Sequence, residues 1–293
     1  MTRLPQIRWL ADGRRLHMQD GPIDLIVDAR GREANVRAAC DAAARRFTGL
    51  LDELCSELPL LRQAADPAQC SLQGAVARRM YDAVAPFAAE HFVTPMAAVA
   101  GSVAEEILGA MTGAARLARA YVNNGGDIAL HLADGESFSV GLMDRLDAAG
   151  LMRTMVIGAH DPIRGVATSG RHGRSFSLGI ADAVTVLADT AAMADAAATM
   201  IANAVDLPDH PEIERVPANE LQPDSDLGPR LVTRRVPKLS AEDIDTALNA
   251  GVTFAEGVRV RGLIRAAALH LQGRTRLVGA TPELEKEDLR AYG

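Results

Sequence analysis

Apolar and polar residues alternate in short bursts over residues 7–29, and two Asp-Gly pairs separate these bursts, at 12–13 and at 20–21. Alternation with a period of two is typical of β-strands, and Asp-Gly is a frequent residue pair in tight hairpin turns. We therefore predict that the chain begins with an antiparallel meander.

A repeat of three to four residues replaces this alternation over residues 33–61 and predicts one long amphipathic helix. Its apolar positions are Val36, Cys40, Ala43, Phe47, Leu50, Leu51 and Leu54. A second helix is predicted over residues 72–89, ending before the Thr94-Pro95 pair. An alanine-rich helix is expected over 97–111 and another over 191–205, with Thr190 as the N-cap of the latter.

The remaining apolar segments are short and predict strands. One ends at residue 122, and others cover 128–132, 138–142, 154–158 and 182–188. Residues 208–237 are rich in proline and charge, which favours a long surface excursion ordered against a partner subunit, and hence a homodimer. Residues 258–278 return to a strand or helix-plus-strand pattern, and 282–293 form a charged tail. The mixture of helices and strands predicts an α/β (α+β) protein.

The amino-acid composition and net charge exclude several classes of protein. The chain has 293 residues, of which 48% are hydrophobic, enough for a globular fold with a large core. Its net charge of −7 repels phosphate backbones and anionic lipid, so we expect no nucleic-acid partner. No apolar run approaches the roughly 18 to 20 residues of a membrane span, and residues 1–10 lack a cleavable hydrophobic segment. We expect a cytoplasmic protein without membrane contact.

The three cysteines, Cys40, Cys55 and Cys70, are odd in number and form no Cys-x-x-Cys pair. This pattern argues against both a disulfide framework and a zinc site. Cys40 and Cys55 lie on the apolar side of the first helical pattern, so we expect them to be packing residues.

A turn with two glycines follows the strand that ends near residue 122. It comprises Asn124, Gly125, Gly126 and Asp127. Glycines permit positive φ angles and expose successive N–H groups, which can accept a phosphate or a flavin edge. Asn-Gly alone also indicates an ordinary hairpin. The hydrogen-bonding side chains of Asn123, Asn124 and Asp127 exceed what a turn requires.

Two further groups of polar residues suggest a ligand. Asp195 and Thr199 share one face of a helix and offer two hard oxygen ligands suited to Mg²⁺ or Ca²⁺. The alternative is structural, with Asp195 favoured by the helix dipole and Thr199 bonded to a backbone carbonyl. The segment 168–175 packs two guanidinium groups, an imidazole and three hydroxyls around two glycines. That composition suits an anionic ligand, although a solvated loop is equally compatible with it.

Four segments occur in an order that resembles the ApbE-like superfamily, which contains FAD:protein FMN transferases, and within it the UPF0280 family. The segments are Pro95–Gly101, Asn124–Asp127, Thr168–Gly170 and Ala194–Thr199. The resemblance covers about residues 23–205. It implies an ApbE-like fold in which mixed or antiparallel sheets are flanked by helices, with residues 1–293 forming a single domain of two intertwined lobes.

The resemblance also implies a ligand set. A divalent cation, Mg²⁺ first, would be held by Asp195, Thr199 and a backbone carbonyl at Ala97 or Ala98. FAD or a related anionic ligand would lie across the glycine turn and the following loop. The implied binding residues are Asn124, Gly125, Gly126, Asp127, Thr168, Ser169, Gly170 and Arg171. In the transferases, Mg²⁺ bridges the FAD pyrophosphate while a threonine of an acceptor protein attacks the phosphorus and expels AMP.

The chain departs from the transferases at specific positions. Ala100 stands where they carry lysine, their His-Ile-x-Asp-Pro segment is absent, and Arg174 stands where the UPF0280 branch tends to have histidine. Three hypotheses follow. The protein is a metal-dependent enzyme of cofactor or sulfur metabolism acting on a small anionic or nucleotide substrate, an FMN transferase with an acceptor protein, or a non-catalytic ligand-binding or assembly subunit.

Overall fold

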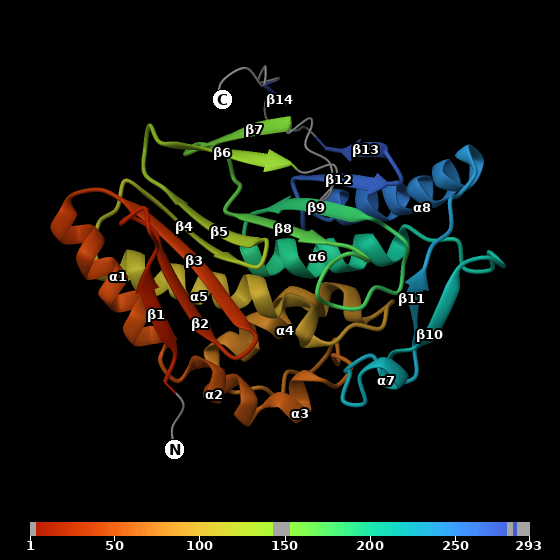
Figure 1. The fold of residues 1–293 in the computed structure, drawn as a ribbon, viewed down its shortest axis with the longest axis horizontal. Coiled ribbons are helices and arrows are strands. Elements are labelled where there is room, and N and C mark those ends of the chain that lie inside the picture. Colours follow the sequence, from red (N-terminus) through yellow and green to blue (C-terminus); the bar gives the residue numbers. More distant parts are fainter. Residues whose placement is uncertain (1–3, 143–152, 280–283, 286–293) are drawn as a thin grey trace.

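The computed structural model describes residues 4–142, 153–279 and 284–285. Within these residues a nine-stranded antiparallel sheet runs in the order β1-β2-β3-β4-β5-β8-β9-β12-β13 (Figure 1). Its strands are β1 (Gln6–Trp9), β2 (Leu16–Asp20), β3 (Ile23–Arg30), β4 (Arg119–Asn124), β5 (Asp127–Leu132), β8 (Gly165–Ser169), β9 (Ala183–Ala188), β12 (Ala266–Leu271) and β13 (Arg274–Val278). Two smaller sheets comprise β6 (Ser137–Leu142), β7 (Arg153–Gly158) and β14 (Leu284–Glu285), and β10 (Glu214–Pro217) with β11 (Leu231–Arg235).

Helices cover one face of the large sheet, and β6 and β7 cover part of the other (Figure 1). The helices are α1 (Glu33–Phe47), α2 (Leu50–Ser56), α3 (Leu58–Leu61), α4 (Ala75–Ala88), α5 (Val99–Ala114), α6 (Ala191–Ala204), α7 (Ala218–Leu221) and α8 (Ala241–Val260), with a 3₁₀ turn at Pro95–Ala98. The main core lies between sheet and helices and contains Phe47, Phe87 and Ile107. A smaller core around Leu130 and Ile157 lies under β6 and β7. The predicted α/β class, with antiparallel sheets flanked by helices, is confirmed.

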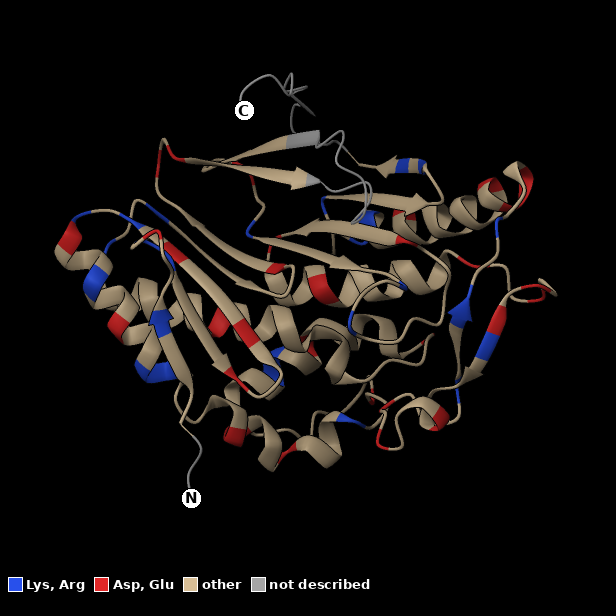
Figure 2. Cartoon of the chain, viewed as in Figure 1, with Lys and Arg blue, Asp and Glu red and all other residues tan. Residues whose placement is uncertain are grey.

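Helix α5 and the start of α6 approach each other unusually closely. A Cβ atom at Gly101 of α5 would overlap the backbone carbonyl of Ala191. A Cβ atom at Gly165, which lies in β8, would overlap the backbone carbonyl of Thr190. The small residues of the alanine-rich segments therefore let backbone meet backbone. Asp195 is the one charged residue in the sequence of α6, which is otherwise uncharged in Figure 2.

Several predicted boundaries are wrong. The long helix expected over 33–61 is three helices, because Gly49 takes a φ of +83° and redirects the chain. Cys40 is buried as predicted, but Cys55 is exposed after this break. Thr168 and Ser169, predicted to lie in a loop, end strand β8, and α8 was not predicted. The meander of β1 to β3, the strands β6, β7 and β9, and the Thr190 cap of α6 are confirmed.

The excursion 208–237 packs on its own subunit. Val232 is buried, Asp226 accepts a hydrogen bond from Thr94 at 2.5 Å, and Asp224 pairs with Arg62 at 2.8 Å. Leu221 and Leu231 of this excursion are exposed. The homodimer stays a prediction, as does the division into two lobes. The predicted charged tail 282–293 lies outside the described residues except for Leu284–Glu285, which form β14. None of the helices described is both long enough and apolar enough to cross a membrane.

Candidate functional site

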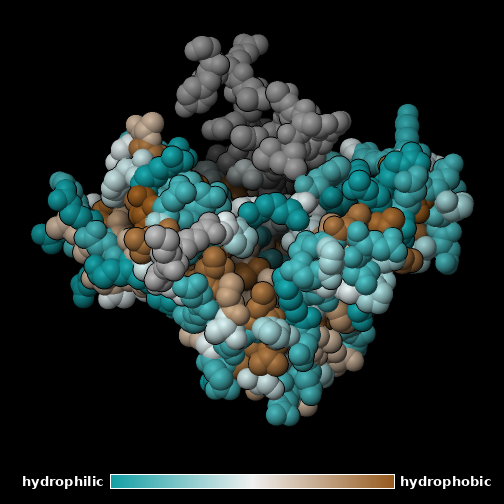
Figure 3. Space-filling model, turned by 60° about the horizontal axis from the view of Figure 1, so that its bottom comes forward, coloured by the Kyte–Doolittle hydropathy of each residue, from teal (hydrophilic) through white to brown (hydrophobic). Residues whose placement is uncertain are grey.

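A cavity of about 2100 Å³ opens at the end of the large sheet. The β4-β5 turn, the β8-β9 loop, the start of α5 and the middle of α6 line it. Figure 3 shows hydrophobic residues in a hollow on this face, bordered by hydrophilic ones. All the site residues predicted from the sequence line this cavity: Ala97, Asn124, Gly125, Gly126, Asp127, Thr168, Ser169, Gly170, Arg171, Asp195 and Thr199.

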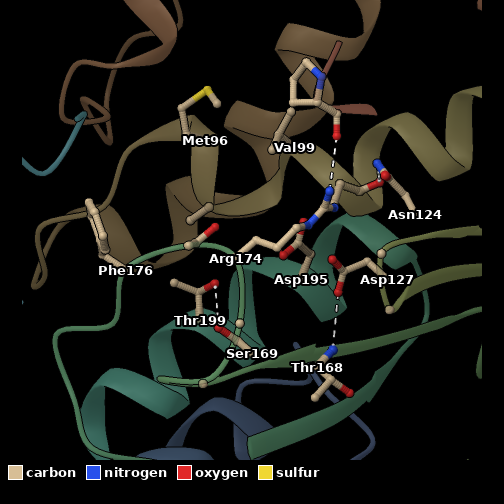
Figure 4. Close-up of a pocket in the computed structure, with 18 of the residues that line it drawn as sticks. Met96, Val99, Asn124, Asp127, Thr168, Ser169, Arg174, Phe176, Asp195 and Thr199 are labelled. Carbon is tan, nitrogen blue, oxygen red and sulfur yellow. Dashed lines mark hydrogen bonds between the residues drawn. The ribbon is translucent and has the colours of Figure 1, made fainter. Parts of the chain in front are cut away.

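Two carboxylates face each other in the cavity. Asp127 begins β5 and points to the helix side of the sheet, where Asp195 projects from α6 (Figure 4). Asp195 is only 9% exposed, and its Oδ2 accepts a hydrogen bond from the Gly101 N–H at 2.9 Å. Asp127 Oδ1 accepts one from the Thr168 N–H at 3.3 Å. Among the described residues, neither carboxylate has a basic side chain within ion-pair distance.

The surroundings of these carboxylates favour their neutral forms. Burial raises the pKa of Asp127 to about 7, although the Thr168 N–H and the charge of Arg174 oppose this rise. Burial also raises the pKa of Asp195 well above its ordinary value of 3.8, and the nearby charge of Asp127 adds to the effect. A cation placed beside this pair would remove both the repulsion and the desolvation cost.

Asn124 connects the pair to α5. Its Nδ2 donates a hydrogen bond to the Ala100 carbonyl at 3.2 Å, while its buried Oδ1 has no partner among the residues described. The backbone contacts of Asp195 come from the N–H groups of Ala100 and Gly101. Ala97 lines the cavity, and its predicted role as a carbonyl ligand stays a prediction.

The glycine turn is a tight hairpin, with Asn124 paired to Asp127. Gly125 and Gly126 have φ angles of +68° and +117°, which glycine adopts readily. The Gly126 N–H donates to Asn123 Oδ1 at 2.8 Å, so it is used within the turn. The structural explanation therefore accounts for Asn123, and a ligand role for the turn stays a prediction.

The side chains at the end of β8 point to two opposite faces of the sheet. The Ser169 hydroxyl lies 3.5 Å from that of Thr199, on the side of α6. Thr168 instead pairs through its hydroxyl with Thr185 at 2.9 Å, and alternation along the strand directs it to the opposite face. The Arg171 guanidinium is bound to Asp182 at 2.5 Å. The structure thus brings Ser169 and Thr199 together, whereas the side chains of Thr168 and Arg171 bind Thr185 and Asp182.

Sequence reasoning missed two features of this site. The pairing of Asp127 with Asp195 was not predicted, because nothing in the local sequence shows that β5 and α6 meet. An apolar wall formed by Met96, Val99 and Phe176 also borders the cavity (Figure 4). The Pro-Met-Ala-Ala-Val run could have indicated part of this wall, because its apolar residues precede a helix made of small residues.

The raised pKa values predict how stability depends on pH. The folded protein holds the protons of Asp127 and Asp195 more tightly than the unfolded chain, whose aspartates titrate near 3.8. The stability due to the Asp127 proton is complete at low pH and is lost as the pH rises through about 7, and the stability due to the Asp195 proton changes in the same direction. With EDTA present, we expect the free energy of unfolding to fall from about pH 6 to pH 8. Urea unfolding at both values should show a smaller fall for Asp127→Asn, and an equal fall would contradict the pKa assignment.

UPF0280 proteins are among the related sequences that comparison with known proteins finds. UPF0280 proteins from Methanopyrus kandleri, Methanocella arvoryzae and Methanococcoides burtonii are 35%, 36% and 34% identical over 61%, 55% and 53% of this chain. The matches span 69%, 63% and 62% of those proteins, so the last two cover less than two thirds of the relative's length.

Solved structures and a protein family also match. The apo crystal structure of the Pseudomonas stutzeri flavinyl transferase ApbE aligns over 96% of both chains, with 13% identity and a TM-score of 0.41, too weak a likeness to indicate a shared function. The model of the family described as AbpE bacteria matches residues 7–277. This match spans most of the chain and confirms the resemblance drawn from the four ordered segments. The chain therefore belongs to the AbpE bacteria family.

Proposed function

We propose that this protein binds a divalent cation, Mg²⁺ first, together with a small phosphorylated ligand, and that its activity is metal-dependent chemistry on that ligand. The observation that carries this proposal is the carboxylate pair. Asp127 and Asp195 face each other with raised pKa values, and no basic group within the described residues pairs with either. Such an arrangement costs stability in the metal-free protein, which a bound cation would recover.

The oxygen donors around the pair suit a hard cation. Ser169 and Thr199 offer hydroxyls, and Asn124 offers a buried carbonyl oxygen that lacks a partner among the described residues. Mg²⁺ prefers carboxylate, carbonyl and water oxygens, and it usually keeps several waters. No cluster of three or more acidic, histidine or cysteine side chains fit for a metal occurs in the part of the chain described, so neutral oxygens must complete the set. A bound cation would polarise a phosphate oxygen of the ligand.

The cavity itself favours a ligand with both an anionic and an apolar part. Its volume of about 2100 Å³ exceeds the roughly 300–1,000 Å³ of ordinary small-molecule pockets. The wall of Met96, Val99 and Phe176 adjoins the polar groups of the carboxylate pair. A flavin nucleotide such as FAD, which the family resemblance implies, combines these properties.

FMN transfer is the less favoured form of this chemistry. The resemblance places a lysine of the transferases at Ala100, and Ala100 lies beside the pair, where its carbonyl accepts from Asn124. That position therefore supplies no positive charge to a developing phosphate anion, a loss that typically lowers rates about a hundred- to a thousandfold. The acceptor protein, the homodimer, the cytoplasmic location and the link to cofactor or sulfur metabolism stay predictions.

The proposal predicts a joint effect of metal and ligand on melting temperature. We expect Mg²⁺ alone to stabilise the protein, by about 2.7 kcal/mol at a hundredfold excess over its Kd. FAD or ADP should add more stability in Mg²⁺ than in EDTA. Asp195→Ala should lose the response to Mg²⁺, whereas Asp134→Asn, which changes an exposed turn residue outside the cavity, should keep it.

The same samples separate the alternatives. A wild-type protein that responds to neither Mg²⁺ nor the nucleotides would contradict the proposal. Release of AMP from FAD, with covalent flavin fluorescence on an acceptor protein, would instead establish FMN transfer.

A further inference from the structure

Four basic side chains that lie in the described residues line the cavity: Arg62, Arg171, Arg174 and Lys238. Two of them form ion pairs with aspartates of the protein. Arg62 pairs with Asp224 at 2.8 Å, and Arg171 pairs with Asp182 at 2.5 Å. Their charges are neutralised within the protein, so neither offers a free guanidinium to a ligand.

Arg174 is placed differently. Its Nη1 donates a hydrogen bond to the Pro22 carbonyl at 3.2 Å, and no carboxylate among the described residues lies within the 4.0 Å of an ion pair. Figure 4 shows its guanidinium extending over the carboxylate pair, next to Asn124. A side chain that served only to neutralise Asp127 or Asp195 would be expected to bond to them, because charge-assisted bonds are the stronger ones. Arg174 bonds instead to a neutral carbonyl and keeps most of its donors free.

The loop that carries Arg174 has a fixed base. Asp182 accepts from Arg171 Nε at 2.8 Å through Oδ1 and from the Gln272 N–H at 2.6 Å through Oδ2. A Cβ at Gly170 would meet the Asp182 carbonyl at 2.5 Å, so the loop also packs closely there. Arg171 therefore anchors the loop, and Arg174 projects from the anchored loop into the cavity.

Arg174 also explains why the turn beside it has glycine at position 125. A Cβ at Gly125 would overlap Arg174 Nη2 and lie 3.1 Å from its Cζ. The guanidinium thus covers the turn, and the Gly126 N–H already donates to Asn123. An anion that approaches this turn meets Arg174 before it meets the backbone.

We propose that Arg174 is the residue that binds the phosphate group of the ligand, in place of the backbone N–H groups of the glycine turn. The planar guanidinium offers parallel donors that match two phosphate oxygens. Its position beside the apolar wall and the carboxylate pair selects a phosphate ester whose remaining part is apolar or aromatic. The inference rests on the proposed function only for the presence of phosphate in the ligand.

Binding of ADP to purified variants tests this inference by calorimetry, with Mg²⁺ and separately with EDTA. Arg174→Ala should weaken ADP binding by about 10- to 100-fold in both conditions, the range for a charge-assisted hydrogen bond. Its affinity for Mn²⁺ alone should not fall, because Arg174 donates no ligand atom and its positive charge beside Asp127 opposes cation binding. Arg45→Ala removes the same charge from an exposed position outside the cavity, and it should change ADP binding by less than about threefold.

A second pair of variants tests the geometry without changing charge. Gly125→Ala should displace the guanidinium and weaken ADP binding as Arg174→Ala does. Gly13→Ala is the matched control, because Gly13 has a similar φ of +63° with open space around it. Both alanines strain the backbone, and only the one at position 125 reaches Arg174.

The possible results distinguish a failure of this inference from a failure of the proposed function. Wild-type ADP affinity in Arg174→Ala, or an equal loss in Arg45→Ala, would overturn the inference and leave metal binding intact. An Arg174 effect that persists while neither Mg²⁺ nor Mn²⁺ binds would contradict the proposed function alone. A wild-type protein that binds no ADP in either condition would contradict both.

Discussion

Gly101→Ala is expected to destabilise the protein by about 1 to 3 kcal/mol, the usual cost of overpacking a core. The new Cβ would overlap the Ala191 carbonyl oxygen and meet the Ala192 nitrogen at 2.9 Å. These neighbours are backbone atoms at the start of α6, so the two helices must move apart. Because the Gly101 N–H also bonds to Asp195, the same change should weaken metal binding.

Gly109→Ala is the matched control, because it lies in the same helix with no other atom within 4 Å of the added Cβ. Alanine at an open helical position stabilises by about 0.5–1 kcal/mol. Urea unfolding of the two variants should therefore show shifts of opposite sign. Shifts of equal sign and size would mean that α5 and α6 are not in backbone contact.

The local sequence predicted the elements that are set by nearby residues, such as turn pairs and helix caps. The Asp-Gly pairs fixed the β1 to β3 meander, and Thr190 caps α6 by accepting from the Met193 N–H at 3.2 Å. The prediction of one long helix was wrong at Gly49, because the apolar repeat continues past this residue although its positive φ ends the helix. Strand β8 was missed because its residues Gly165–Ser169 are small and partly polar.

The sequence predicted which site residues share one helix or strand, but it did not predict which elements meet at the site. Asp195 and Thr199 share a helix face because of their spacing, which the sequence shows directly. That Asp127 meets Asp195 depends on β5 lying beside β8 and on α6 packing below them. Arg171 and Arg174 look equivalent in the sequence. They differ because Asp182 lies beside Arg171, an arrangement set by the pairing of β9 with β12.

Asp195→Asn is expected to abolish metal binding while keeping the fold. The amide has nearly the same shape as the carboxylate, and its oxygen can still accept from the Gly101 N–H. Because burial and the charge of Asp127 disfavour an ionised Asp195, replacing this carboxyl by an amide should also stabilise the metal-free protein as the pH rises. Calorimetric scans in EDTA measure this gain, and a lower melting temperature than wild type would contradict it.

Binding of Mn²⁺, followed by loss of the electron paramagnetic resonance signal of the free ion, tests the central claim most directly. The wild-type protein should bind about one equivalent, and Asp195→Asn should bind at least about 100-fold more weakly, because it lacks one of the two charged ligands. Asp134→Asn should bind as wild type does. Equal Mn²⁺ affinity in wild type and Asp195→Asn, or no binding by the wild type, would contradict a cation site at Asp127 and Asp195.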